Sequence, residues 1–535
     1  MKRARSIAGL ALMLLAGSAE PALCAGTSAE VTACGHTRPA AGGTIEVPAG
    51  SDLQAAIDRA RPGDTLVLAA GATFVGPFTL PRKRGSGWIT LRSSELERLP
   101  PAGTRVDPSH ASAMPKLEAE RGAVIATEPS AQRYRLIGLE IRPARGVFLT
   151  ELVRLGRDAG QNKANTPAHF LIDRCYLHGD PELGARRGVA LNSSSTDVLS
   201  SYFADFKERD ADSQAIAGWN GPGPFRIVGN YLEAAGENVM FGGADPSVRN
   251  LVPSDIEVRD NHFRKPLAWK DATKGGSWSV KNLFELKNAR RVVVADNLFE
   301  HNWVGSQSGF AILLTVRNQD GNAPWSTVED VTFTRNVLRH AASGISILGR
   351  DDNHPSLRAR RIRITHNLFD DIGGPAWGGG GVLLQLIGGA SDVVFDHNTA
   401  FHTDNVITAE GEPHARFVFS NNIVQQNQYG IIGTGTGPGL PTLARYFPGA
   451  RVEGNAFIGG AADAYPARNF FPASMREVGL ARREKEKWPA LVNTSPLRGK
   501  ATDGADVGAG SEVQPAQPSS VAGTSGGTAA RSERR

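Results

Sequence analysis

The sequence predicts an all-β fold, a right-handed parallel β-helix whose coils stack as a solenoid behind an N-terminal capping helix. A short strand pattern around a small polar residue, most often asparagine, recurs at intervals of about 24 to 39 residues. Apolar and polar residues alternate in each copy, which is the period of a strand and not of a helix. Strands too short to form a sheet alone, repeated at this period, bury their apolar faces by stacking coil on coil.

The repeated polar position predicts a ladder along the inside of one turn of the coil. Asparagine side chains on successive coils hydrogen-bond to one another when they stack. Unrelated turn asparagines in a β-sandwich would not keep the same flanking apolar pattern. The expected ladder residues are Cys175, Ser201, Asn230, Asn261, Asn297, Asn336, Asn367, Asn398, Asn422 and Asn455.

A second apolar run follows each ladder turn, as in NLFELKN, AILLTVRN and GISILGRDD. We therefore expect a coil to consist of a ladder turn, a strand, a loop, a second strand and a second loop. Ahead of the repeat, residues 51–54 have the form of a capping box, with Ser51 as the capping residue. They predict a helix that ends at residues 61–64, before a first strand at 65–68.

The two ends of the chain predict segments outside the solenoid. A basic start, an apolar run over residues 7–17 and small residues at 22–25 predict a signal peptide over 1–25 and a secreted or periplasmic protein. A lead-in over 26–43 precedes the β-helix, which is expected over 44–510. The tail over 511–535 contains mainly proline, serine, glycine and alanine, and this composition predicts disorder.

The bulk composition limits the classes of partner. Apolar residues make up 40% and charged residues 21% of the 535 residues, as in soluble globular proteins, and no later stretch predicts a transmembrane segment. The net charge of +5 suits an acidic polymer. Nucleic acid is not an expected partner, because no basic stripe carries stacking aromatic residues. After removal of the signal peptide, Cys34 and Cys175 are the two cysteines that could pair.

The cap SDLQAAIDRARPGDTLVL, the NLF-type ladder and the ending DGADVGA resemble the pectate-lyase-like superfamily over residues 44–508. The stretch GWNGPGPFRIVGNYLEAAGENVMFGG resembles a group of bacterial secreted β-helix proteins. The superfamily resemblance implies a polymer held along one face of the solenoid. Its members include polysaccharide lyases, glycoside hydrolases, epimerases, and non-catalytic adhesins and tail spikes, so the fold does not choose among these activities.

Alternation places one row of charged side chains on the outside of the second strand. In NLFELKN, Phe284 and Leu286 point inward, so Glu285 and Lys287 point outward. The same reasoning turns Arg317 outward on the next coil. The residues expected along this face are Trp219, Asn220, Glu237, Asn238, Glu285, Lys287, Arg317, Arg350 and Asp352.

This set of side chains fits β-elimination on a uronate polymer. The reaction needs a cation on the sugar carboxylate, a base for the neighbouring proton and a proton donor for the leaving oxygen. We assign catalysis to Lys287 as base with Arg317 and Glu285, because an arginine grips a carboxylate with two hydrogen bonds. The expected substrate-binding residues are Trp219, Asn220, Arg350 and Asp352.

Calcium is the one cofactor that the sequence suggests. Glu237 and Asn238 carry the oxygen ligands that Ca²⁺ prefers. The segments GENVMF and FELKN resemble the glutamate-containing coils of the alginate-lyase and chondroitinase-B branch. In that branch the acidic pair and the lysine lie in one segment, whereas here they are divided between two coils.

Three functions remain open from the sequence. The first is an exported lyase that acts on an acidic polysaccharide. The second is a non-catalytic carbohydrate-binding or envelope scaffold, in which the charged row is a solvated face with weak ion pairs. The third is a glycoside hydrolase, which would need two carboxyl groups at about 5 to 9.5 Å, from pairs such as Asp351 with Asp352 or Asp370 with Asp371.

Overall fold

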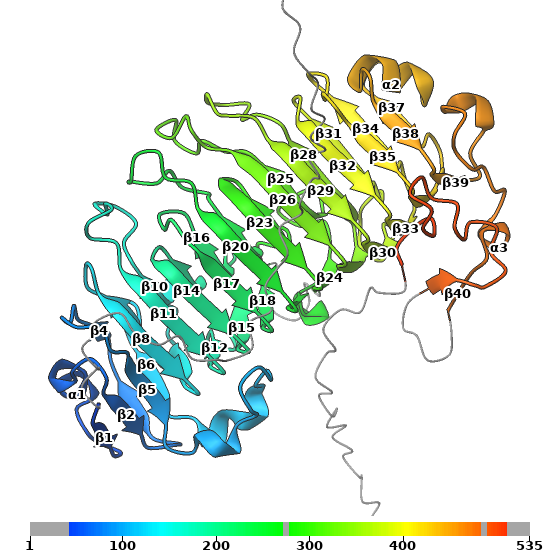
Figure 1. Cartoon of the computed structure of the whole chain (residues 1–535). Helices are drawn as coiled ribbons and strands as arrows, with labels where there is room; N and C mark the ends of the chain where they lie inside the picture. The colour runs from blue at the N-terminus through cyan, green and yellow to red at the C-terminus, as the bar shows by residue number, and fades with distance from the viewer. Residues whose placement is uncertain (1–41, 271–277, 483–488, 511–535) are drawn as a thin grey trace, which may run out of the picture. The chain divides into compact units, whose positions relative to one another are not determined.

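The computed structural model describes residues 42–270, 278–482 and 489–510. Three long parallel sheets run through them, and Figure 1 shows their strands stacked coil on coil. Each complete coil contributes one strand to each sheet, in the order A, B and C. The predicted signal peptide and most of the lead-in lie outside the described residues, as do Cys34 and the tail over 511–535. Among the described residues, no helix is long and apolar enough to cross a membrane.

The 14-stranded sheet A is formed by the segments that precede the ladder position. Its strands are β1 (Thr44–Val47), β2 (Thr65–Leu68), β5 (Ile89–Ser93), β8 (Gln132–Ile137), β11 (Ala168–Asp173), β14 (Ser194–Leu199), β17 (Phe225–Val228), β20 (Ser254–Arg259), β23 (Ala289–Ala295), β26 (Val328–Thr334), β29 (Arg360–Thr365), β32 (Ser391–Asp396), β35 (Val418–Ser420) and β38 (Arg451–Glu453).

The 13-stranded sheet B is formed by the segments that follow the ladder position. Its strands are β3 (Thr73–Val75), β6 (Lys116–Ala119), β9 (Glu140–Pro143), β12 (Tyr176–His178), β15 (Tyr202–Phe206), β18 (Tyr231–Ala234), β21 (His262–Arg264), β24 (Leu298–Asn302), β27 (Val337–Ala341), β30 (Leu368–Ile372), β33 (Thr399–His402), β36 (Ile423–Gln425) and β39 (Ala456–Ile458).

The 12-stranded sheet C contains the second apolar runs of the repeat. Its strands are β4 (Phe78–Leu80), β7 (Ile125–Thr127), β10 (Glu151–Leu155), β13 (Arg187–Leu191), β16 (Gln214–Gly218), β19 (Glu237–Phe241), β22 (Phe284–Leu286), β25 (Phe310–Thr315), β28 (Ser343–Leu348), β31 (Leu384–Ile387), β34 (Ile407–Glu410) and β37 (Ile431–Gly433).

A coil therefore holds three strands, one more than the sequence pattern predicts. The segment around each ladder residue bends there and divides between sheets A and B. The residue before the ladder position adopts a left-handed conformation, for example Asp260 with φ 56°, Asp296 with φ 60° and Arg335 with φ 52°. Such a conformation is uncommon for residues other than glycine, and it turns the chain sharply enough to start a new sheet.

The predicted ladder is confirmed, and it is continuous. The backbone nitrogen and the Nδ2 of Asn297 both donate to Oδ1 of Asn336, at 3.0 and 2.9 Å. The pattern begins with Cys175, whose backbone nitrogen donates to Ser201 Oγ at 3.1 Å. It ends with Asn455, which donates in the same way to Asn469. Because Asn469 follows Asn455 by less than one coil, the repeat gives no sign of its role.

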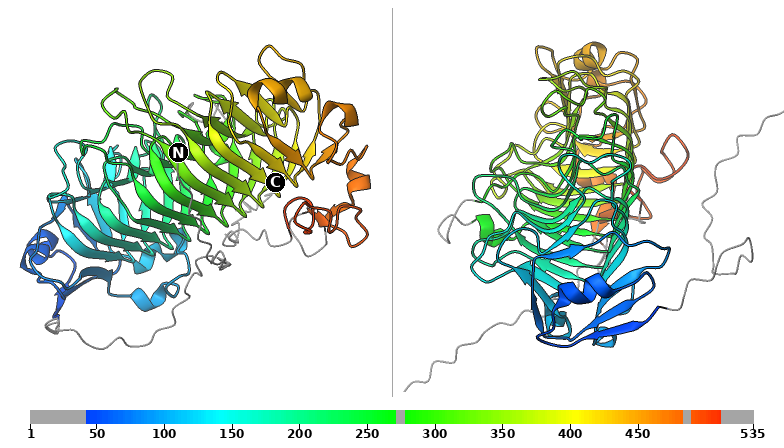
Figure 2. Two further views of the ribbon diagram at one scale, coloured as in Figure 1. Left: turned by 45° about the horizontal axis from the view of Figure 1, so that its top comes forward. Right: turned by 90° about the vertical axis from the view of Figure 1, so that its left-hand side faces the viewer.

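The capping helix is also confirmed, with a shift of one residue in its start. Helix α1 spans Leu53–Arg59, and its N-cap is Asp52 rather than Ser51, because Asp52 Oδ1 accepts from the backbone nitrogen of Ala55 at 2.9 Å. Figure 2 shows α1 lying across the first coil. At the other end, α2 (Leu440–Tyr446) packs against β34 and β37, and α3 (Met475–Val478) precedes the antiparallel pair β40 (Leu480–Arg482) and β41 (Pro489–Leu491).

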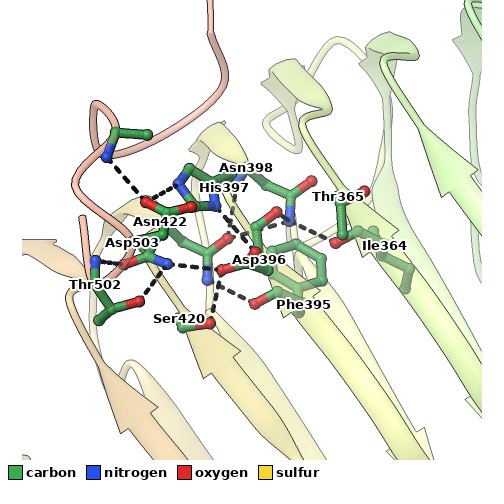
Figure 3. Close-up of polar contacts among 12 residues, drawn as sticks. Ile364, Thr365, Phe395, Asp396, His397, Asn398, Ser420, Asn422, Thr502 and Asp503 are labelled. Carbon is green, nitrogen blue, oxygen red and sulfur yellow. Dashed lines mark hydrogen bonds and ion pairs between the residues drawn. The ribbon is translucent and has the colours of Figure 1, made fainter. Parts of the chain in front are cut away.

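The final described segment tucks against the outside of the ladder turn. Gly508 N donates to the carbonyl oxygen of Asn421 at 2.7 Å, and Ala509 N donates to Thr399 Oγ1 at 2.9 Å. Figure 3 shows Thr502 and Asp503 of this segment beside Asp396 and His397 of the ladder turn. The end of the chain's described part therefore covers the outer side of the last coils.

Candidate functional site

The outward face of sheet C holds one row of side chains in strict register. Met240, Glu285, Leu313 and Ser346 occupy equivalent positions on β19, β22, β25 and β28. The residues on either side of Glu285 lie in the central core, at 0% exposure. Equivalent positions on neighbouring strands are about 4.8 Å apart, so the row can contact one extended ligand.

Glu285 lies at the centre of a polar cluster on this row. Its carboxylate is 3.6 Å from the Nζ of Lys287, and it accepts from Asn282 Nδ2 at 3.1 Å and from Thr315 Oγ1 at 3.4 Å. The Glu285 side chain is only 2% exposed, whereas that of Lys287 is 15% exposed. Lys287 is therefore the member of the pair that an incoming ligand reaches.

Arg317 lies on the next coil, and its backbone nitrogen donates to the carbonyl oxygen of Lys287 at 2.9 Å. Its Nη1 contacts two carboxylates, Asp351 at 2.8 Å and Asp352. Asp351 is buried and accepts the backbone nitrogen of Asn318 as well, so it fixes the guanidinium from below. The guanidinium itself remains 28% exposed.

The next two predicted residues differ in their surroundings. Arg350 is exposed, and no described residue pairs with it. Asp352 is 64% exposed and already contacts Arg317. Arg350 is thus a free cation at the edge of the row, while Asp352 partly neutralises the arginine beside it.

A second buried carboxylate lies one coil before Glu285. Glu237 is fully buried, accepts from Gln214 Nε2 at 2.8 Å, and lies 3.8 Å from the Nζ of Lys281. Burial raises the pKa of Glu237 to about 7, and the charge of Glu285 adds to the rise. Lys281 contacts Asp212 at 2.5 Å as well. Asp212, Glu237, Lys281, Glu285 and Lys287 form what we name the sheet C charge cluster.

The sequence pattern did not point to Lys281 or Asp212. Both residues lie ahead of their strands, where the alternation that marks an outward position has not begun. Lys281 precedes β22 and Asp212 precedes β16. The one local feature that could have indicated Lys281 is its position six residues before Lys287 in the same segment.

Trp219 lies on the same side of the sheet but is nearly covered. It is 6% exposed and packs with Ala190, Ala217 and Met240. The guanidinium of Arg187 lies 5.0 Å from the centre of its ring. Arg187 also donates to Gln214 Oε1 at 2.8 Å. The tryptophan therefore supports Arg187 and presents little surface to a ligand.

Asn220 and Asn238 are the predicted residues that the structure places inside. Both are fully buried. Asn220 Nδ2 donates to the carbonyl oxygen of Arg157 at 2.8 Å, and its Oδ1 accepts the backbone nitrogen of Ser247 at 2.9 Å. These bonds hold two loops together and leave the Asn220 amide unable to bind a substrate.

Asn238 belongs to a buried lysine site instead of a metal site. Its Nδ2 donates to the carbonyl oxygens of Leu232 and Arg264, at 2.6 and 2.9 Å. Its Oδ1 lies 3.2 Å from the Nζ of Lys265, which also donates to the carbonyl oxygens of Ala234, Ala235 and Gly236. Lys265 is fully buried, and burial lowers its pKa to about 7.

The residues expected to hold calcium do not fit that ion. Asn238 is turned away, and an ammonium group approaches each buried carboxylate: Lys281 approaches Glu237 and Lys287 approaches Glu285. Calcium needs six to eight oxygen ligands. Within the described ranges, no group of three or more acidic, histidine or cysteine side chains is arranged to hold a metal.

The aspartate pairs that hydrolysis would need already contact other side chains. Asp351 and Asp352 both contact Arg317. Asp371 lies on sheet B, where its carboxylate accepts from Trp377 Nε1 at 2.9 Å and contacts His340 at 2.8 Å. Neither pair presents two free carboxyl groups across a ligand.

Comparison with known proteins gives a likeness of fold. No family model matches the chain, and no curated protein matches it. Among solved structures, the PL6 family alginate lyase AlyGC is similar over 89% of this chain and 57% of its own, at 13% identity and a TM-score of 0.51. The chain thus spans less than two thirds of that protein.

Two further structures are similar at lower TM-scores. A GH87 α-1,3-glucanase from Streptomyces thermodiastaticus gives 0.49 at 13% identity, over 85% of this chain and 72% of its own. The PL6 family polysaccharide lyase Pedsa3628 from Pseudopedobacter saltans gives 0.45 at 12% identity, over 81% and 98%. Together with its three parallel sheets, the likeness to AlyGC shows that this chain has a right-handed parallel β-helix fold.

Proposed function

We propose that the protein is an exported polysaccharide lyase that cleaves a uronate-containing polymer by β-elimination on the outward face of sheet C. One observation supports this most directly. Two cations, Lys287 and Arg317, lie on neighbouring coils, and their backbones are joined by a hydrogen bond. Both side chains are partly exposed. A row of this kind along stacked strands suits a long acidic chain.

The residues take distinct roles in the proposed reaction. Arg317, held by Asp351 and Asp352, positions the uronate carboxylate, and the exposed Arg350 adds a second cation at the edge. Lys287 acts as the base in its deprotonated form, and its amine takes the proton from the carbon beside the carboxylate. The bond from the adjacent carbon to the glycosidic oxygen then breaks, a carbon–carbon double bond forms, and the leaving oxygen takes a proton from solvent water.

Glu285 is a positioning residue in this scheme. It is too deeply buried to meet a sugar, but its carboxylate holds Lys287 against the sheet together with Asn282 and Thr315. Preorganised groups of this kind supply much of the catalytic effect because they need not reorient when the substrate binds.

The test is a screen of uronate polymers for the unsaturated product. Purified protein is incubated with alginate, pectate, glucuronan and glycosaminoglycans, and the ultraviolet absorbance of the new double bond is followed. A rise that disappears in Lys287→Ala supports the proposal. New reducing ends without that absorbance would instead indicate hydrolysis.

A non-catalytic role is the second candidate, and a specific observation favours it. Lys287 is paired with Glu285, and Arg317 is paired with two aspartates, so each cation already has an internal partner. A face of this kind can bind an acidic chain without cleaving it. Binding of a uronate polymer with no product of either kind would support this role.

A further inference from the structure

A separate hollow of about 380 Å³ lies on the last coils of sheet C. Its polar lining comes from Gln385 on β31, Thr408 and Glu410 on β34, and the loop after β37 with Thr434 and Thr436. None of these residues belongs to the sheet C charge cluster or to its arginine neighbours. The hollow is therefore a distinct feature of the same sheet.

The hollow continues the outward row that contains Glu285. Along this row the register runs from Glu285 through Leu313, Ser346 and Gln385 to Thr408. Four strand spacings separate Glu285 from Thr408, which is about 19 Å along the sheet. A polymer that crosses the strands at Lys287 and Arg317 reaches the hollow after several sugar units.

Two groups in the hollow are left for a ligand to bind. Ser346 Oγ donates to Gln385 Oε1 at 2.9 Å, and this bond fixes the amide while none of the described residues accepts from its Nε2. The hydroxyl of Thr408 is buried and has no partner among the described residues. Buried polar groups in native proteins are nearly always hydrogen-bonded, so the Thr408 hydroxyl points to a ligand with hydroxyl groups, and the half-buried amide of Gln385 beside it offers a donor to such a ligand.

The charge of the hollow selects against a carboxylate. Among the described residues, Glu410 is the one charged residue that lines the hollow, and it is exposed. Arg445 of α2 stands beside the hollow, with its guanidinium 3.4 Å from the carbonyl oxygen of Gly435 and 5.2 Å from the centre of the Tyr446 ring. A carboxylate of the polymer in the hollow would lie against Glu410, whereas neutral sugar hydroxyls can donate to it.

The other direction along sheet C has the opposite character. Arg154 on β10 is in register with Ala190 on β13, and Arg187 lies at the start of β13. Both arginines are partly exposed. Both also lie within 4.0 Å of the buried carboxylate of Glu151, and the row between Arg154 and Glu285 is apolar, with Ala190, Ala217 and Met240. The early coils thus place arginines beside the row, whereas the described lining of the hollow contains none.

We propose that the hollow is a binding subsite for a neutral sugar unit of the polymer whose uronate unit lies at Lys287 and Arg317. The substrate class is then a mixed polysaccharide, in which uronate and neutral residues occur in one chain, rather than a homopolymer of uronate. This inference rests on the proposed function. It adds to it the kind of sugar unit that the substrate carries where it crosses the late coils.

The experiment measures binding apart from turnover. Lys287→Ala is used as the background, so that no substrate is consumed. Isothermal titration calorimetry compares neutral hexose oligosaccharides of gluco, manno and galacto type with uronate oligosaccharides of equal length and with mixed oligosaccharides. The same titrations are made in Gln385→Leu, Thr408→Leu and Glu410→Gln, each on that background.

We expect mixed or neutral oligosaccharides to bind roughly tenfold more weakly when Gln385 or Thr408 loses its hydrogen bond. Thr332→Leu, an equivalent change on the outward face of sheet A, should leave the affinity unchanged. Glu410 is exposed, so Glu410→Gln tests the subsite without risk to the core. This variant should bind neutral oligosaccharides more weakly. Its affinity for uronate oligosaccharides should not rise to the affinity for neutral ones.

Two results would overturn the subsite. One is unchanged affinity for every oligosaccharide in all three variants. The other is uronate binding that falls in Thr408→Leu and also in Arg445→Ala, a fourth variant titrated on the same background, which would mean that the hollow accepts a carboxylate. Failure of the proposed function is distinguishable, because it appears as the absence of unsaturated product with the wild-type protein, whatever the titrations show.

Discussion

The backbone nitrogen of Arg317 donates to the carbonyl oxygen of Lys287 at 2.9 Å, so the two cations of the proposed site are joined through the sheet itself. Their side chains differ in what holds them. Glu285 holds Lys287, and Asp351 with Asp352 holds Arg317. A change at either cation should therefore disturb the site without disturbing the coil.

Lys287→Ala is expected to abolish formation of unsaturated product while the melting temperature stays within a few degrees of the wild type. The side chain contacts a carboxylate on the outside of the sheet and fills no core space. Arg317→Lys should lower kcat/KM strongly, because lysine cannot reproduce a grip with two parallel hydrogen bonds. The control is Arg363→Ala on the outward face of sheet A. Full activity in Lys287→Ala would remove its role as base.

Asn297→Leu is expected to destabilise the protein by about 1 to 3 kcal/mol, because several buried partners lose their hydrogen bonds at once. Asn297 Nδ2 donates to the carbonyl oxygen of Val258 at 2.9 Å, and its Oδ1 accepts from Asn261. Urea unfolding followed by circular dichroism measures the change. Asn353→Leu, at an exposed position, is the matched control. Equal stability of the two variants would show that the ladder contributes nothing.

The buried carboxyl group of Glu237 predicts a dependence of stability on pH. Its pKa rises from an ordinary value of 4.5 to about 7 in the folded protein. The folded state therefore binds more protons than the unfolded state between these values, and its stability falls as the pH rises from about 4.5 to 7. Glu237→Gln should remove this loss, which is at most on the order of 3 kcal/mol.

Urea unfolding of the wild type and Glu237→Gln at pH 5 and pH 8 measures the difference. The variant should gain stability relative to the wild type at the higher pH. Glu120→Gln, which changes an exposed carboxyl group, should give parallel curves. An equal change of stability between pH 5 and pH 8 in the wild type and in Glu237→Gln would contradict the assignment to Glu237.

His397 predicts a second pH dependence, in the docking of the final segment. Burial alone would lower the pKa of His397, but the carboxylate of Asp396 at 3.0 Å and that of Asp503 at 3.6 Å outweigh it and raise the pKa. Its contribution is therefore fully present below about pH 6.5 and is lost as the pH rises through the raised value.

Hydrogen exchange at the Gly508 and Ala509 amides, corrected for intrinsic rates, measures that docking. Protection should fall on the alkaline side of the His397 titration. Asp503→Asn should reduce the fall, because the more distant of the two carboxylates is gone. Protection that stays constant across the titration would show that the segment docks through its neutral contacts alone.

The fold could be predicted from the sequence because the repeat indicates which residues are buried. Alternation identifies strands, and the regular interval of the polar position identifies coils. Two features that the repeat does not encode were missed. The division of each ladder segment between sheets A and B depends on residues in a left-handed conformation, such as Asp296. Asn469 completes the ladder from outside the repeat. The capping residue was displaced by one because Ser51 and Asp52 are both good caps.

The candidate site was predictable only where strands are regular. Glu285 lies between two core residues on β22, so alternation fixes its face, and Lys287 and Arg317 follow from it. Asn220 and Asn238 lie where strands end or begin, and there the chain turns inward to satisfy loop carbonyls. Lys281 and Lys265 lie outside the strand pattern, and their roles depend on which carboxylate or carbonyl oxygens the coils bring to them.

The ladder described above has a direction, and this makes the two ends of the solenoid unequal. From Cys175 to Asn422, each ladder residue donates its backbone N–H, and each asparagine also its side-chain amide, to an oxygen on the following coil, and Asn455 donates to Asn469. Loss of the first coil frees an acceptor, whereas loss of the last frees buried donors, which cost more to leave unpaired. Asn469 closes that open end within the last turn. The ladder therefore needs a terminator at its late end, and Asn469 supplies it.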